Sequence, residues 1–471
     1  MFKGNITNFA TLKLLYLYSN MKKKHIIGLS ITFVVLLGTG LWVKSRYNVW
    51  FGNPEEPAYS PLEMPGRVLL TFGEDESSRN ISWQCDSVVV PSHVLLVDTL
   101  QKDTITIPAD GEVFQSRSGK MTYYVARLRS LKPDRAYSYQ VHNGTKSSDW
   151  YNFRTHNQDT SNNYSFLFMG DVQDTLHGKT NQYLREALHR HKDTEFLLFG
   201  GDIIERPMDK YWGELFNGLD SIAQYYPVLN VTGNHDYLKH VICKLERRFS
   251  LVFSNYLDSQ IGENQVYTLK YNDLQLFLLD SNRELPYLLK QRKWLKKELQ
   301  QSKARWKIVV LHHPLYSIRG KSNNLIQKLV FNPLIEEYNV DLVLQGHEHA
   351  YARRTTHGKA GEITTPVYTV SHCSPKNYHI QFDESFDRFG ISSRYYQRIH
   401  IHQDTLTMVT YDVNTQEVYD SLDILKQPEP AVLDYGKNIP EYLEYAPKRQ
   451  NKKNLKFQQR IDEYKKRTHQ M

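Results

Sequence analysis

Cysteine is scarce in this sequence, with three residues among 471. So small a number excludes a fold built on a framework of disulfide bridges. No recognised nucleic-acid motif is present either, and aromatic residues are not interleaved among the basic ones, so we expect no nucleic-acid partner. The net charge of +8 lies largely in residues 22–24 and 448–467, and it therefore says little about a binding site.

A signal-peptidase site is missing after the apolar run at residues 26–43. This run carries no charge and is just long enough to cross a bilayer. Positive charges lie mainly before it, so the positive-inside rule puts the N-terminus in the cytoplasm and everything after Lys44 outside. Without small residues at a cleavage position, and without a lipobox cysteine, we expect an uncleaved signal anchor within an N-terminal segment of residues 1–50. The part of the chain after this helix would then be periplasmic or extracellular, membrane-anchored through the helix, and secreted only if residues 21–43 are a cleaved signal peptide.

Five short segments carry side chains of the kind that bind metal ions. They are Gly170-Asp171, Gly201-Asp202, Gly233-Asn234-His235-Asp236, His312-His313-Pro314 and Gly346-His347-Glu348-His349. Each follows an apolar run of strand length, at 166–169, 196–199, 228–231, 307–311 and 340–344. Helical patterns at 180–191, 210–223 and 287–303 lie between the runs, which predicts an α/β fold whose loops meet at one sheet edge. Carboxylate, amide and imidazole groups gathered there predict a two-metal hydrolase site.

These five segments, in this order, resemble the calcineurin-like metallophosphoesterases, and within them the purple acid phosphatases. The resemblance covers residues 67–425, and the last segment continues as Ala350-Tyr351-Ala352-Arg353, as in the purple acid phosphatases. It implies a four-layer α/β/β/α catalytic domain, which we expect over residues 160–425.

The resemblance also implies two metal ions per chain, with Fe, Zn and Mn as the open choices. Position by position, it makes Asp202 the bridge between them, with Asp171 and His349 on the first ion. The second ion would be held by Asn234, His312 and His347. His235 would face the substrate and serve the leaving group, with Asp236 orienting it.

The first metal site departs from the family pattern. Purple acid phosphatases have a Tyr three residues after the bridging Asp, whereas this chain has Glu205 there, so no purple iron chromophore is expected. The wider superfamily has a His two residues after the first Asp, and here that residue is Gln173. Either Glu205 or Gln173 completes the site, and we favour Glu205 because it brings charge.

Histidine is also missing where plant-type members bind phosphate, since residues 316–321 contain none. Arg319 is the better substitute, because a guanidinium can hold two phosphate oxygens at once. Arg206 is a second candidate for substrate binding.

Residues 57–156 contain no metal-type cluster. Their strand-like runs at 67–71, 80–83, 93–97, 123–127 and 137–141 alternate with turn-forming residues, which predicts an all-β sandwich. The stretch from Leu131 to Tyr139 resembles the fibronectin type III-like domain that precedes the catalytic domain of purple acid phosphatases. Residues 426–471 are expected to form a basic polar tail that is solvated and contains a short helix over 455–466.

Together these features predict a metal-dependent phosphoesterase that hydrolyses phosphate monoesters with a metal-bound hydroxide. Two alternatives stay open. The same site would serve a phosphodiesterase, because only the pocket walls differ. A non-catalytic binding protein would keep the fold with a degenerate first metal site, which the identities of Gln173 and Glu205 would explain.

Overall fold

The computed structural model describes residues 6–157, 163–240, 242, 244–254, 261–262, 265–321, 323–358, 361–427, 430–447 and 449–468. Contacts divide the chain into two compact units. The first comprises residues 1–54 and 239–241, and the second comprises residues 55–238 and 242–471. Cys85 and Cys373 are buried and free, while Cys243 lies outside the described residues.

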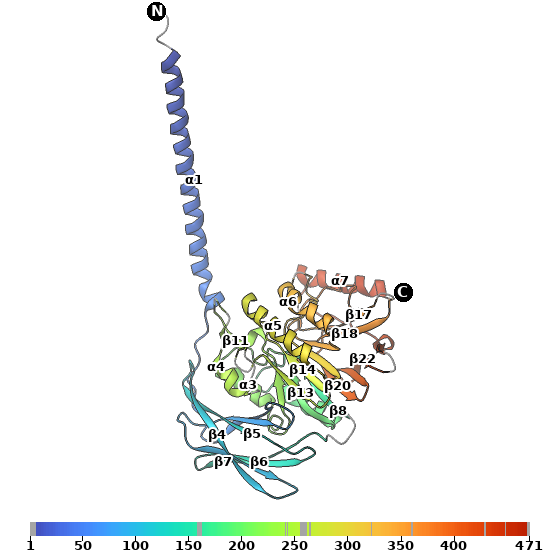
Figure 1. The fold of residues 1–471 in the computed structure, drawn as a ribbon. Coiled ribbons are helices and arrows are strands. Elements are labelled where there is room, and N and C mark those ends of the chain that lie inside the picture. The colour runs from blue at the N-terminus through green and yellow to red at the C-terminus, as the bar shows by residue number, and fades with distance from the viewer. Residues whose placement is uncertain are drawn as a thin grey trace, which may run out of the picture. The chain divides into compact units, whose positions relative to one another are not determined.

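The first unit contains one long helix, α1 (Ile6–Phe51) (Figure 1). Within it, the stretch Gly28–Phe51 is long and apolar enough to cross a membrane, judged by length and composition. This stretch includes most of the predicted span at 26–43 and continues beyond its end.

The second unit begins with an all-β sandwich, which confirms the fold predicted for this part. Its strands are β1 (Gly66–Phe72), β2 (Arg79–Gln84), β3 (Ser92–Asp98), β4 (Thr104–Gln115), β5 (Lys120–Leu128), β6 (Ala136–Asn143) and β7 (Lys146–Arg154). Strand β4 belongs to both halves, because its first part pairs with β3 and its second part with β5. Stacked Trp83 and Tyr124 lie in the core with Tyr139.

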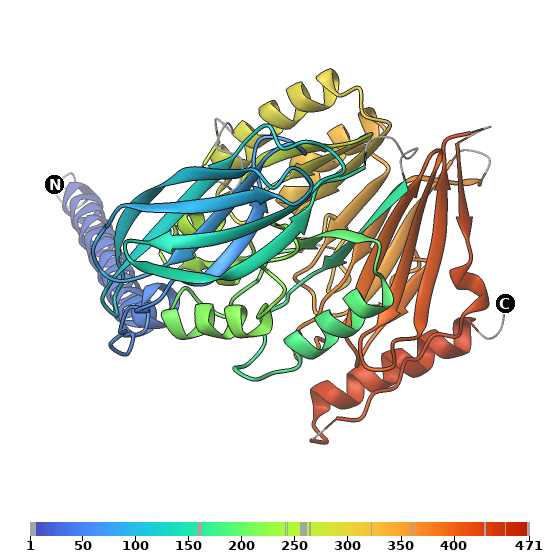
Figure 2. The same ribbon diagram turned by 90° about the horizontal axis from the view of Figure 1, so that it is seen from below.

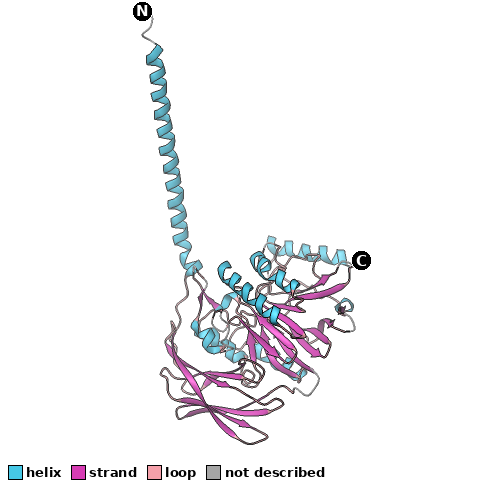
Figure 3. Ribbon diagram, viewed as in Figure 1, coloured by secondary structure: helices cyan, strands magenta, loops and turns pink. Residues whose placement is uncertain are grey.

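Two further sheets form the centre of the α/β domain (Figure 3). The first has the order β10-β9-β8-β20-β21-β22-β23. Its strands are β8 (Asn163–Met169), β9 (Thr194–Phe199), β10 (Val228–Asn230), β20 (Tyr395–His402), β21 (Thr405–Asp412), β22 (Val418–Leu425) and β23 (Ala431–Asp434). The second has the order β13-β14-β15-β16-β18-β17-β19. Its strands are β13 (Tyr267–Tyr271), β14 (Leu274–Leu278), β15 (Trp306–Val310), β16 (Leu342–Gln345), β17 (Tyr351–His357), β18 (Ile363–Val370) and β19 (Arg388–Gly390). A small hairpin pairs β11 (Tyr237–Leu238) with β12 (Lys244–Leu245).

The two sheets pack face to face between outer layers of helices (Figure 2). One core lies between them, where Phe168 and Leu198 of the first sheet meet Val310 and Leu344 of the second. The helices are α2 (Thr180–Arg190), α3 (Asp209–Gly218), α4 (Arg247–Val252), α5 (Leu285–Gln301) and α6 (Leu325–Glu337), with short 3-10 turns η1 (Asn234–Asp236) and η2 (Gly436–Asn438). Helices α2, α3 and α4 cover the first sheet, and α5 and α6 cover the second. The four-layer α/β/β/α arrangement is therefore confirmed.

The strands expected before the five metal-type segments are β8, β9, β10, β15 and β16. Within each sheet they run parallel, so their carboxyl ends meet at the same edges. The predicted helices correspond to α2, α3 and α5, although α3 ends at Gly218 and not at 223.

The segment after residue 425 differs from the solvated tail that the sequence indicated. Strand β23 pairs with β22 and extends the first sheet. Helix α7 (Lys452–Thr468) buries Phe457, Ile461 and Tyr464 against residues 380–391. The physical reason is the spacing of these three apolar residues, which form one helical face among the basic residues.

Candidate metal centre

The site is built from loops that leave the strand ends in strained conformations. Asp171, Asp202, His347 and His349 all have positive φ, at 48°, 49°, 72° and 46°. Such values are unusual for residues with side chains and concentrate at functional sites. Neighbouring loops also approach closely, because a Cβ on Gly233 would lie 2.0 Å from the Asp202 backbone nitrogen.

Among the described residues, two groups of side chains could each hold a metal ion. Asp202, His312 and His347 form one, and Asp171, Asp202 and His349 form the other, with the ligand atoms of each within 4.8 Å of one another. Asp202 is common to both. Asn234 Oδ1 lies 3.3 Å from His312 Nε2, so this amide joins the group of Asp202, His312 and His347. The structure thus brings together six of the seven residues predicted as ligands.

Hydrogen bonds fix the orientation of two imidazoles. His312 Nδ1–H donates to the Gly200 carbonyl at 2.9 Å, and His349 Nδ1–H donates to the Lys376 carbonyl at 3.2 Å. Since a carbonyl only accepts, each ring presents Nε2 to the site. His312 Nε2 lies 3.3 Å from Asp202, and His349 Nε2 lies 3.4 Å from Asp171. Each Nε2 atom therefore points toward a carboxylate.

The charge balance of the site fits bound cations. Asp171 and Asp202 are fully buried, and Asp171 Oδ1 accepts no hydrogen bond from any described residue. Burial alone would raise the pKa of Asp202, but His312 holds it well below its usual range. In turn, Asp202 outweighs the effect of burial on His312 and raises its pKa to about 10. Burial, together with His313 and His312, lowers the pKa of His347 far below normal. Imidazoles and paired buried carboxylates are a donor set for two divalent or trivalent ions.

His235 lies beside this cluster and reaches solvent. Its Nδ1–H donates to the Glu205 carbonyl at 2.8 Å, and its Nε2 lies 4.0 Å from Asp202 Oδ2. Asp236, expected to orient His235, instead accepts hydrogen bonds from the backbone N–H groups of Gly233, Ile203 and Ile204. It therefore ties together the loops that carry Asp202 and His235.

Glu205 and Gln173, the two candidates for completing the first ion's site, have different surroundings. Glu205 accepts a hydrogen bond from Lys376 Nζ at 2.5 Å and belongs to neither ligand group among the described residues. Gln173 is buried, and no described residue hydrogen-bonds either atom of its amide. The structure therefore leaves the Gln173 amide available, whereas the carboxylate of Glu205 is engaged.

The two predicted substrate arginines both lie at the surface. The Arg319 guanidinium stacks over the Tyr378 ring, 4.8 Å from its centroid. Tyr378 in turn packs on His349, with ring centroids 4.3 Å apart. Arg206 is exposed in the loop that follows Glu205. Arg319 thus borders the metal ligands through one aromatic ring.

Sequence reasoning missed Lys376 and Tyr378, which follow the carboxyl end of β18. A signal was available, because the apolar run at 367–370 precedes the polar stretch Ser371-His372-Cys373-Ser374 in the same manner as the five predicted segments. The Cys373 N–H donates to the Gly170 carbonyl at 2.7 Å, which fastens this segment to the loop of Asp171.

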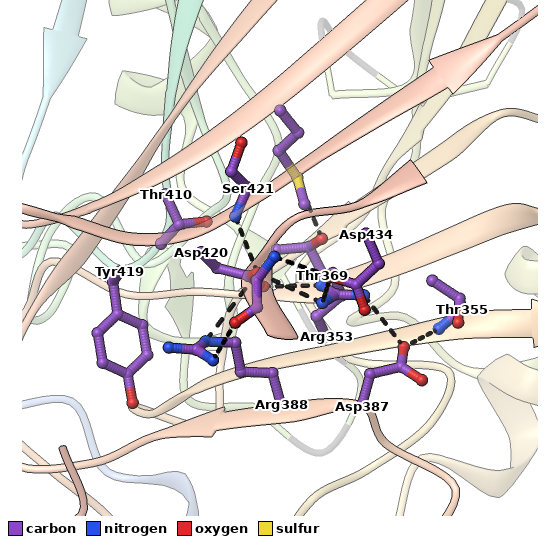
Figure 4. Close-up of polar contacts among 12 residues, drawn as sticks. Arg353, Thr355, Thr369, Asp387, Arg388, Thr410, Tyr419, Asp420, Ser421 and Asp434 are labelled. Carbon is purple, nitrogen blue, oxygen red and sulfur yellow. Dashed lines mark hydrogen bonds and ion pairs between the residues drawn. The ribbon is translucent and has the colours of Figure 1, made fainter. Parts of the chain in front are cut away.

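Arg353, the last residue of the motif Gly346–Arg353, has a structural role. It is buried and pairs with Asp420 at 2.7 Å, Asp434 at 2.8 Å and Asp387 at 3.3 Å (Figure 4). Asp420 also accepts a hydrogen bond from the Tyr351 hydroxyl at 2.6 Å. This network links β17, which leaves the site, to β22 and β23 of the opposite sheet.

Comparison with known proteins agrees with this geometry. The family model described as Calcineurin-like phosphoesterase matches residues 164–351, and that of the purple acid phosphatase N-terminal domain matches residues 65–155. Purple acid phosphatase 7 of Arabidopsis thaliana is 26% identical over 222 residues, covering 42% of this chain and 63% of its own length. A phosphoenolpyruvate phosphatase of Allium cepa is 24% identical over 342 residues, 65% of each chain. The chain therefore spans somewhat less than two thirds of these relatives.

The fold has a solved counterpart. A purple acid phosphatase from yellow lupin (Lupinus luteus) seeds superposes with a TM-score of 0.64 at 15% identity, covering 82% of this chain and 78% of that one. The resemblance drawn from the five segments is thus confirmed. The chain carries a calcineurin-like phosphoesterase domain preceded by a purple acid phosphatase N-terminal domain.

Proposed function

We propose that this protein is a metal-dependent phosphoesterase that hydrolyses phosphate monoesters. The observation that carries the proposal is the pair of ligand groups sharing Asp202 in a fully buried position. A single shared carboxylate keeps two cations close together, which is the arrangement used for displacement at phosphorus. The relatives named as phosphatases support the same reaction class.

Two metal ions fit the residues present. Asp171, Asp202 and His349 would hold the first, and Asp202, Asn234, His312 and His347 the second. We favour Gln173 over Glu205 as the further side chain on the first ion, because the Glu205 carboxylate is paired with Lys376. When bound, such ions activate a water molecule and offset negative charge on the phosphoryl oxygens.

His235 is the residue suited to serve the leaving group. Its Nδ1–H is committed to the Glu205 carbonyl, so Nε2 is the atom free to protonate or hydrogen-bond the departing oxygen. Asp236 supports this role indirectly by fixing the Gly233 backbone before it. Arg319, and Arg206 as second candidate, would bind the phosphate or the rest of the substrate.

We also propose that α1 anchors the protein in a membrane with the catalytic domain on the outer side. The support is the apolar stretch Gly28–Phe51 together with the lysines at 22–24 that precede it.

The decisive experiment compares wild type with Asp202→Ala, measuring metal content and turnover on a phosphate monoester and a diester. Loss of the shared carboxylate should remove metal and activity together, because two cations then repel each other at close range. Asp110→Ala, at an exposed aspartate of the sandwich, is the matched control and should change neither. Faster turnover of the diester would support the phosphodiesterase alternative. Full metal occupancy of the wild-type protein, without turnover of either ester, would indicate a binding protein.

A further inference from the structure

Residues 376–378, which follow β18, border the candidate metal centre and are called the wall below. The Lys376 carbonyl accepts the hydrogen bond from His349 Nδ1 at 3.2 Å, and the Tyr378 N–H donates to the His349 carbonyl at 3.3 Å. The Tyr378 ring also packs on the imidazole of His349. Residues 376–378 are therefore held in a fixed relation to a metal ligand by two backbone hydrogen bonds and one ring contact.

The ammonium group of Lys376 lies on the same side of the centre as His235. Lys376 Nζ donates to Glu205 Oε2, while the other carboxylate oxygen of Glu205 lies 3.9 Å from His235 Nδ1. Glu205 thus links the lysine to the residue that faces the substrate. The Lys376 side chain remains 41% exposed, and its ammonium group has N–H donors beyond the one that Glu205 accepts.

A second cation borders the same segment of residues 376–378. The Arg319 guanidinium packs over Tyr378, and the residue is exposed to solvent. The Tyr378 ring thus contacts both His349 and Arg319. What this wall offers a substrate is positive charge at the rim of a buried centre.

We propose that Lys376 and Arg319 bind a second anionic group on the leaving part of the substrate, so that the preferred substrates are phosphate monoesters carrying a carboxylate or another phosphate near the ester bond. Glu205 is then a positioning residue, which holds Lys376 beside His235 and is not a metal ligand. The inference rests on the proposed phosphomonoesterase function. A cation that already has a carboxylate partner nearby is oriented before the substrate arrives, which lowers the entropic cost of binding.

The test uses two esters that differ in one group. 3-Phosphoglycerate has a carboxylate where glycerol 3-phosphate has a hydroxymethyl group, and both have an alkyl leaving oxygen. Wild type should show a higher kcat/KM for 3-phosphoglycerate. Lys376→Met should lower this preference roughly 10-fold, mainly through KM, since a charge-assisted hydrogen bond is worth about this factor. Turnover of glycerol 3-phosphate and metal content should stay near wild type, and Lys376→Arg should restore the preference.

Lys146→Met is the matched control, because Lys146 also pairs with a carboxylate, Asp86, and is 36% exposed in the sandwich. It should leave the preference unchanged. Equal losses on both esters in Lys376→Met, or an unchanged preference, would overturn the inference. If wild type hydrolyses neither ester, that result counts against the proposed function and not against the inference. Calorimetric binding of the two esters then tests the inference. Equal affinities in wild type would overturn the inference, and a carboxylate preference lost in Lys376→Met would support it.

Discussion

At the scale of single residues, the candidate centre separates buried metal ligands from groups that reach the substrate. Asp171, Asp202 and His312 are almost completely buried, whereas His235 keeps 28% of its side chain exposed. Metal binding and proton transfer can therefore be tested independently by substitution.

His235→Ala should retain metal but lose turnover. General acid assistance is typically worth about 100- to 10,000-fold, and the loss should be smaller for a nitrophenyl ester, whose leaving group is already a weak base. Metal content and turnover would be measured on one aryl and one alkyl phosphate. Loss of metal together with turnover would instead identify His235 as a ligand, and equal losses on both esters would indicate that it binds the phosphoryl group.

Arg353→Met should destabilise the fold by roughly 3–5 kcal/mol, because it leaves Asp387, Asp420 and Asp434 without their shared cation. Denaturant unfolding would measure this change in free energy. The neighbouring Arg354, which donates to the Ser385 carbonyl and packs over Tyr316, provides the control. Arg354→Met should cost about 1 kcal/mol or less. Equal costs for the two substitutions would contradict a special role for the buried network.

Glu246 should make stability depend on pH. Burial raises its pKa from 4.5 to about 7, although Arg248 lies 3.2 Å away and acts in the opposite direction. Between these values the folded state holds a proton that the unfolded state releases, so this carboxyl's contribution to stability falls as pH rises from about 4.5 to 7. The full effect is on the order of 3 kcal/mol.

Unfolding free energies at pH 5 and pH 7 would test this, with Glu246→Gln for comparison. The glutamine cannot titrate, so the difference between the two pH values should shrink in the variant. An unchanged difference would mean that other groups cause the pH dependence.

At the scale of elements, α7 is the part of the chain whose role differs most from its composition. Although the helix is rich in basic residues, Phe457 stacks on His379 with centroids 4.3 Å apart, and Arg460 donates to the Ile380 carbonyl at 2.9 Å. Residues 379 and 380 directly follow the wall that contains Lys376 and Tyr378. Helix α7 thus supports the segment that borders the metal centre.

Phe457→Ala should lower the free energy of unfolding by about 3–5 kcal/mol, as expected for removing a buried aromatic side chain. Leu455→Ala on the same helix is the control, because Leu455 is 55% exposed and should cost less than about 0.5 kcal/mol. Thermal or denaturant unfolding of both variants would measure the difference. Similar small effects would show that α7 is only loosely attached in solution.

At the scale of the whole molecule, the apolar stretch of α1 predicts that the protein is located in a membrane. Full-length protein should sediment with membranes and resist extraction by high salt, because about 20 apolar residues partition into lipid. Removal of residues 1–54 should release a folded protein with unchanged metal content. Recovery from the soluble fraction of a chain that has been cut just after Val43 would identify a signal peptide instead.

The sequence by itself predicted seven ligands, six of which the structure brings together, and the strands that present them. Asp171, Asp202, Asn234, His312 and His347 each lie within three residues of the end of an apolar run, and the ends of parallel strands meet whenever the sheet forms. Local pattern was sufficient for these residues. The sandwich strands β1, β2, β3, β5 and β6 were predicted for the same reason. Each has an alternating or continuous pattern of buried side chains within a few residues, as in β1 and β6.

Only the tertiary structure decided which groups pair across the fold. Lys376 and Glu205 are 171 residues apart, and no local pattern reveals that the lysine engages the carboxylate expected to bind metal. The same holds for α7, whose three buried side chains needed residues 380–391 as a partner before their spacing became meaningful. Charge and burial at these positions depend on contacts between distant segments, because a side chain's surroundings are set by the packed fold and not by its neighbours in sequence.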